Sequence, residues 1–89
     1  MDEFLLISFD STSDAMVGEL KVKGENIRAR LVPLLPQIDA GCGLALRTDL
    51  SNHKKVYGIF ENMGLSFKQM YILTYENLRK PRLRTYDLS

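Results

Sequence analysis

The order of the apolar segments is the feature that most constrains the fold of this chain. A nearly continuous apolar run, "FLLISF" (Phe4–Phe9), is typical of a central strand. Alternating apolar and charged residues over Ile27–Val32 predict a half-buried strand, and the short run Gly43–Arg47 predicts a third. The aromatic and β-branched segment Phe67–Tyr75 predicts a fourth. Four strands are therefore expected, and the segments between them decide how these strands connect.

Two of the connecting segments have helical patterns. Ser11 followed by Asp14 resembles a capping box and predicts a helix that ends near Gly24. Its apolar side is expected to consist of Ala15, Met16, Val17 and Leu20, and Glu19 can pair with Lys23.

A second helix is predicted from Ser51 to a cap at Gly64. Its apolar residues at helical spacing are Val56, Ile59, Phe60 and Met63. Gly58 inside this helix lowers its stability, which predicts close packing at that position.

The resulting order is β-α-β-β-α-β. Two right-handed β-α-β crossovers that share a central hairpin predict an α+β fold, a ferredoxin-like sandwich with a four-stranded antiparallel sheet and both helices on one face. The chain has 89 residues, which is enough for one domain. We assign residues 1–76 to this domain and residues 77–89 to a basic, loosely ordered C-terminal tail that Pro81 interrupts.

Charge and composition exclude several classes of protein. The formal net charge of +1 is too small to predict binding to nucleic acid or to an acidic membrane. No apolar run approaches the roughly 20 residues of a membrane span, and the apolar stretch of "MDEFLLISF" is too short for a signal peptide. A single cysteine forms no internal disulfide and no Cys-x-x-Cys metal or redox pair. We therefore expect a cytoplasmic protein without a metal or cofactor.

That cysteine, Cys42, is the main candidate for a functional residue. The predicted topology places its loop at the sheet edge where the first helix begins, and a helix N-terminus favours a thiolate. Gly41 and Gly43 leave space on both sides of the sulfur. Further hydrogen-bond donors are expected from the hydroxyls of Ser11, Thr12 and Ser13.

Two observations oppose an activated Cys42. Asp14 and Asp39 are expected nearby, and a carboxylate close to a thiolate disfavours it. A lone cysteine in a small protein is also commonly a buried small hydrophobic residue, with the glycines serving only the turn. Both interpretations remain open on the residues alone.

The segments "SFDSTSDAM" and "RLVPLLPQIDAGCGLALR" resemble the selenium/sulfur carrier-like family of small bacterial proteins over Phe4–Tyr75. The family pattern has a cysteine before a glycine after a proline-containing loop, which matches Cys42, Gly43 and Pro33. This chain departs from the pattern where the family has proline, arginine and serine in the loop and sometimes a histidine before the first helix. Those positions hold Leu35, Pro36, Asp39 and Ser13.

The resemblance implies a carrier or accessory protein rather than an enzyme. Cys42 would hold sulfur or selenium as a persulfide or perselenide and pass it from a donor protein to an acceptor protein. The alternative is a binding or dimerisation module with a structural Cys42. Such a module would form a dimer through the open face of the sheet. The dimer would bury additional apolar surface and so compensate for the low stability that a small core provides.

Other sites are less well supported by the sequence. The first loop lacks the paired cysteines of a heavy-metal-binding domain, and the third strand lacks the exposed aromatic residues of an RNA-recognition module. His53 is expected at the opposite edge from Cys42, as a solvated helix residue. Five aromatic residues are interpreted as core or interface residues, namely Phe4, Tyr57, Phe60, Phe67 and Tyr71. The tail's basic residues are interpreted as solvated, with partner docking as the alternative: Arg79, Lys80, Arg82 and Arg84.

Overall fold

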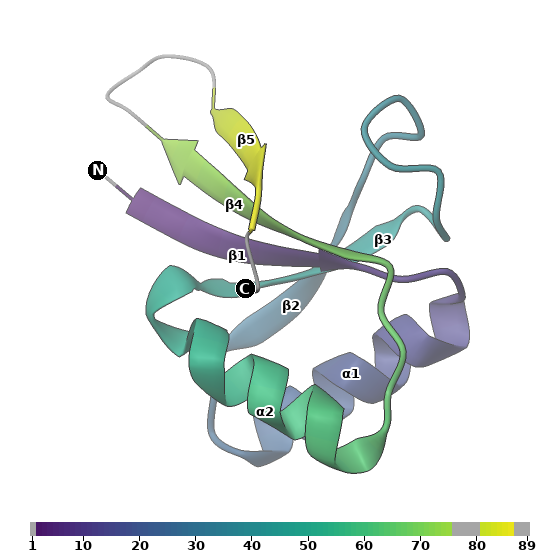
Figure 1. The fold of residues 1–89 in the computed structure, drawn as a ribbon, viewed down its shortest axis with the longest axis vertical. Helices are drawn as coiled ribbons and strands as arrows, with labels where there is room; N and C mark the ends of the chain where they lie inside the picture. The colour runs from purple at the N-terminus through teal and green to yellow at the C-terminus, as the bar shows by residue number, and fades with distance from the viewer. Residues whose placement is uncertain (1, 76–80, 87–89) are drawn as a thin grey trace.

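The computed structural model describes residues 2–75 and 81–86, which form an α+β fold with two helices and a five-stranded sheet (Figure 1). The strands are β1 (Asp2–Ser8), β2 (Ala29–Pro33), β3 (Leu44–Asp49), β4 (Gln69–Tyr75) and β5 (Arg82–Thr85). The helices are α1 (Thr12–Gly24) and α2 (His53–Met63), and the short 3₁₀ turn η1 (Leu50–Asn52) precedes α2. Up to β4, the order of strands and helices is the predicted one.

The strand order in the sheet is β2-β3-β1-β4-β5, and every neighbouring pair is antiparallel. The prediction of four strands is therefore wrong by one. β5 lies in the segment predicted as a loosely ordered tail, and its Leu83 is the register partner of Leu73 in β4. A four-residue strand with one apolar residue has almost no sequence signal, which explains the error. The predicted boundary at 76/77 and tail residues 77–80 and 87–89 lie outside the described residues.

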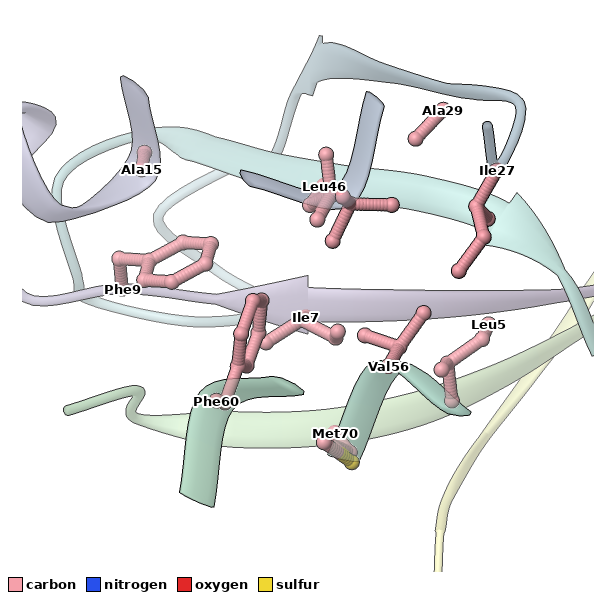
Figure 2. Close-up of a cluster of buried hydrophobic side chains, with 11 residues drawn as sticks. Leu5, Ile7, Phe9, Ala15, Ile27, Ala29, Leu46, Val56, Phe60 and Met70 are labelled. Atoms are coloured by element: carbon pink, nitrogen blue, oxygen red, sulfur yellow. The ribbon is translucent and has the colours of Figure 1, made fainter. Parts of the chain in front are cut away.

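The main core lies between the sheet and the two helices, which lie on the same side of it (Figure 1). Leu5, Ile7 and Phe9 alternate along one face of the first strand, as a half-buried strand requires. They pack against residues of the helices and of the neighbouring strands (Figure 2). The other buried residues of this core are Ala15, Val22, Ile27, Ala29, Leu46, Val56, Phe60 and Met70. Burial of each large side chain contributes about 1.5–3 kcal/mol.

Helix α1 faces the core with a different side from the predicted one. It buries Ala15, Gly18 and Val22, whereas Met16 and Leu20 are 59% and 73% exposed, and Val17 is exposed as well. Gly18 explains the orientation. A Cβ there would lie 3.1 Å from Phe9 Cζ, so glycine allows this close approach of the helix to the core without a shift of the Phe9 ring.

The predicted ends of α1 and the predicted ion pair between Glu19 and Lys23 agree with the structure. Ser11 is the N-cap, and its side chain accepts a hydrogen bond from the amide of Asp14. Glu19 lies 3.3 Å from Lys23 and also accepts a hydrogen bond from the backbone N–H of Leu31, which ties the helix to β2.

Helix α2 buries Val56 and Phe60 and ends at Gly64, whose φ of 66° is the left-handed cap expected of glycine. The close packing predicted at Gly58 is wrong, because a Cβ at that position would meet nothing within 4 Å. Within the described residues, neither helix combines the length and the apolar content needed to cross a membrane.

The opposite face of the sheet has a second, smaller core. Leu6, Leu34 and Ala45 are buried there, with Tyr71 and Leu83 among the partly buried residues around them. Leu34, at the start of the loop between β2 and β3, belongs to this core, and the loop rises away from the helices (Figure 1) before Cys42 returns to the main core. Part of the face that the sequence led us to expect as open is therefore covered by the chain itself.

Candidate functional site

The loop between β2 and β3 carries Cys42 next to the connection from β1 to α1. The backbone N–H of Cys42 donates to the carbonyl oxygen of Phe9 at 2.9 Å, and Phe9 lies two residues before the N-cap Ser11. The thiol is half-buried against the main core, and its S–H donates to the carbonyl oxygen of Leu44 at 3.8 Å. The cysteine thus lies beside the segment that starts the first helix, and the residue as a whole is partly exposed.

The two glycines beside Cys42 have different roles. A Cβ on Gly41 would lie 2.3 Å from the carbonyl oxygen of Phe9, so this position requires a glycine for the close approach of two backbone segments. Gly43 has a φ of 88°, which other residues rarely adopt, and its carbonyl accepts a hydrogen bond from the amide of Leu34 at 2.9 Å. A Cβ on Gly43 would meet nothing within 4 Å, so the chain leaves space on that side of the cysteine.

Asp39 fixes the loop through its carboxylate, which is only 7% exposed. One oxygen accepts the backbone N–H of Gly41 at 2.9 Å. The other accepts the hydroxyls of Ser8 at 2.8 Å and Tyr71 at 2.7 Å. These contacts connect the loop to β1 and β4, and they leave the carboxylate with three hydrogen-bond donors.

The electrostatics of this cluster follow from burial and hydrogen bonding. Burial raises the pKa of Asp39, but the hydrogen bonds from Tyr71, Ser8 and Gly41, with help from the positive charge of Lys68, outweigh it and lower the pKa below its usual value of 3.8. Burial and the neighbouring Asp39 carboxylate raise the pKa of Tyr71 to about 12. The cluster therefore consists of an ionised carboxylate and a neutral phenol over the whole neutral range.

Sequence reasoning placed Asp39 near Cys42 as an opposing charge and missed its role in the loop. The signal was present, because an aspartate that accepts the amide two residues later forms an Asx turn, and Asp39 precedes Gly41 by two residues. Its other two partners come from distant strands, and no local pattern shows them.

A cation near the loop was also missed. The backbone N–H of Lys68 donates to the carbonyl oxygen of Ser8 at 2.7 Å, and its side chain passes within 3.3 Å of where a Cβ on Gly41 would lie. Its ammonium group is 3.9 Å from the carboxylate of Asp10. The family pattern has an arginine within the loop, and here Lys68, just before β4, brings a positive charge to the same neighbourhood.

The remaining predicted residues lie in two places. Ser11 caps α1, and Thr12 and Ser13 are exposed in its first turn. His53 begins α2, where it is half-buried and hydrogen-bonded to the hydroxyl of Tyr86. The interpretation of His53 as a solvated residue is therefore wrong, because Tyr86 follows β5, the strand that the sequence did not predict. In the described part of the chain, no group of three or more His, Cys, Asp or Glu side chains could hold a metal ion.

Comparison with known proteins adds one finding. Residues 4–72 match the model of the family described as "Putative Se/S carrier protein-like". The match includes β1, the cysteine loop, both helices and the first part of β4. No curated protein and no solved structure matches the chain.

Proposed function

Because the chain belongs to the Se/S carrier-like family, we propose that Cys42 is a carrier thiol that accepts sulfur or selenium from one protein and passes it to another. The observation that carries the proposal is the way the loop holds the cysteine. Its backbone is fixed by the Phe9 carbonyl and by the Asp39–Gly41 contact, whereas the residue as a whole is only half-buried. A carrier needs such a thiol, held in one place yet accessible to two partners in turn.

The surroundings of Cys42 support this role. A Cβ on Gly43, the residue after Cys42, would meet nothing within 4 Å apart from its chain neighbours, so no distant segment crowds this position. The N-terminus of α1 supplies positive electrostatic potential to this end of the sheet, which favours an anionic persulfide, and the Lys68 ammonium lies there too, 3.9 Å from the Asp10 carboxylate. The ferredoxin-like architecture is part of this proposal, since the order β2-β3-β1-β4 is the one that two interleaved β-α-β units produce.

The proposed transfer is redox-neutral. The Cys42 thiol loses its proton to solvent, and the thiolate attacks the outer sulfur of a donor persulfide, R–S–S⁻. A Cys42–S–S⁻ bond forms, the donor S–S bond breaks, and the donor leaves as R–S⁻. An acceptor thiolate then attacks the outer sulfur in the same way and releases the Cys42 thiolate. With a donor R–S–Se⁻, the selenium atom is transferred by the same two steps.

Alkylation kinetics test the reactivity that this function requires. Iodoacetamide should alkylate Cys42 in the native protein at neutral pH at least as fast as in the urea-unfolded protein. Cys42→Ser is the control for other sites of alkylation. A native thiol that reacts much more slowly than the unfolded one would contradict the carrier role and favour the alternative, a binding module with a structural cysteine.

A further inference from the structure

Three arginines and one aromatic ring line a pocket at the end of the sheet away from Cys42. Arg28 directly precedes β2, Arg30 lies on β2, Arg47 lies on β3, and Phe4 lies near the start of β1. The pocket has a volume of about 390 Å³. Pockets that hold small molecules have volumes from about 300 Å³ upwards, so this one is large enough for a phosphate group and part of the molecule that carries it.

The strand register places two of these positive charges opposite each other. Arg30 pairs directly with Arg47 in the β2–β3 ladder, where opposite Cβ atoms are about 5 Å apart. Arg28, directly before β2, lines the same pocket. Like charges at directly opposite positions destabilise a sheet. The fold therefore keeps an arrangement that lowers its own stability.

Carboxylates in the described part of the chain only partly offset the charge of this cluster. Among residues 2–75 and 81–86, none of the three guanidinium groups forms an ion pair. Asp49 also lines the pocket, so one negative charge faces three positive ones there. The excess of two positive charges matches the charge of a phosphate dianion.

The Arg47 guanidinium is already oriented. Its central carbon lies 4.9 Å from the centre of the Phe4 ring, a cation–π contact that limits its rotamers. The Phe4 ring in turn packs edge-on against Tyr75, with ring centres 5.9 Å apart. Arginine side chains present paired N–H donors that match phosphate oxygens, and a pre-oriented guanidinium loses less entropy when it binds.

We propose that this pocket binds the phosphate group of a small molecule, with Arg30 and Arg47 as the two principal contacts and Arg28 as the third. Inorganic phosphate and a phosphate ester share this chemistry. The site is separate from the sulfur chemistry, because Phe4 and Phe9 are five residues apart on an extended strand, roughly 17 Å. The inference therefore stands whether or not Cys42 is a carrier.

A titration followed by NMR on the ¹⁵N-labelled full chain tests the proposal. Inorganic phosphate, pyrophosphate and adenosine monophosphate are added separately at constant ionic strength, with chloride as the reference anion. We expect saturable shifts of the amides of residues 28–30 and 47–49. Stronger binding of the monophosphate than of inorganic phosphate would identify an ester as the ligand, and the reverse would identify the free ion.

Two variants distinguish specific binding of phosphate in this pocket from non-specific attraction of anions to positive charge. Arg30→Gln should weaken phosphate binding about tenfold, the loss expected for one hydrogen bond to a charged group. Lys21→Gln removes the same charge from an exposed position on α1 and should leave the affinity unchanged. An equal effect of both variants, or shifts that chloride reproduces, would overturn the proposal. The proposal would also be overturned if single-stranded RNA bound saturably at these residues and none of the three small ligands did.

Discussion

The two ends of β1 hold charged groups in opposite ways. Near Ser8, the carboxylate of Asp39 is buried and accepts three hydrogen bonds. Near Phe4, Arg30 and Arg47 are directly opposite each other in the strand register, and neither forms an ion pair with any described residue. A buried charge with all its partners inside the chain serves the fold, whereas unpaired like charges at the surface are available to a ligand.

This comparison predicts that changes at the Asp39 end lower stability and that changes at the arginine end do not. The largest effect is expected for Asp39→Ala. It removes three hydrogen bonds and leaves the buried Ser8 hydroxyl with only its longer contact to the carbonyl oxygen of Gln69, at 3.3 Å, so the free energy of unfolding should fall by about 3 kcal/mol. Urea denaturation measures it. A loss below about 1 kcal/mol would show that Asp39 does not hold the loop.

The same carboxylate predicts an acid dependence. Its pKa is lowered in the folded state, so its contribution is present above the ordinary value of 3.8 and is lost progressively as the pH falls below that value. Asp39→Asn has no such titration. The unfolding free energy of this variant should therefore fall less steeply with acid than that of the wild type, and parallel profiles would contradict the assignment.

Gly41→Ala should have the next largest effect. Its Cβ would lie 2.3 Å from the Phe9 carbonyl oxygen, so the loop must move, at a cost of about 2–3 kcal/mol. Gly58→Ala is the matched control. The new methyl group meets nothing within 4 Å inside α2, and helix propensity predicts a gain of about 0.5–1 kcal/mol. Equal effects of the two substitutions would show that Gly41 is not required for the close approach.

Tyr71→Phe should have a smaller effect, because it removes one hydrogen bond to Asp39, worth about 1 kcal/mol. The phenol has a pKa of about 12 in the folded state against an ordinary 10.0, so its contribution is complete below pH 10 and is lost as the pH rises towards 12. Ultraviolet titration of the tyrosines should show one late-titrating group that is absent from the variant. Identical titrations would exclude the Asp39 contact.

Arg30→Gln should have the smallest effect and the opposite sign. Removing one of two facing positive charges should raise the unfolding free energy of the ligand-free protein by about 0.3 kcal/mol, and added salt should reduce this gain. A clear loss of stability at low salt would mean that the arginines serve the fold, as Asp39 does.

The sequence was sufficient for the parts of the fold that depend on local pattern. The strand and helix order up to β4 was predictable from periodicity, and the Ser11 cap and the Gly64 cap from residue type. Chain direction alone then placed Cys42 beside the start of the first helix, and its contact with Phe9 agrees with that placement.

The missed features depend on contacts between distant segments. Met16 and Leu20 are apolar at helical spacing, but α1 instead places Gly18 inward because the glycine allows a closer approach. Lys68 reaches the cysteine loop from the segment before β4, and Arg30 faces Arg47 only once the strand register is known. Neither relation has a signal in the local sequence.

The most direct test of the carrier role is sulfur exchange between two copies of the protein. Cys42 is loaded with glutathione persulfide, the excess is removed, and the loaded protein is mixed with an equal amount of unloaded ¹⁵N-labelled protein. Intact mass spectrometry then follows the added sulfur atom, with Cys42→Ser as the control that should not load. The account predicts that one sulfur atom is added per chain and spreads to the labelled copy. A native protein that does not load, or a loaded one that never transfers its sulfur, would contradict it.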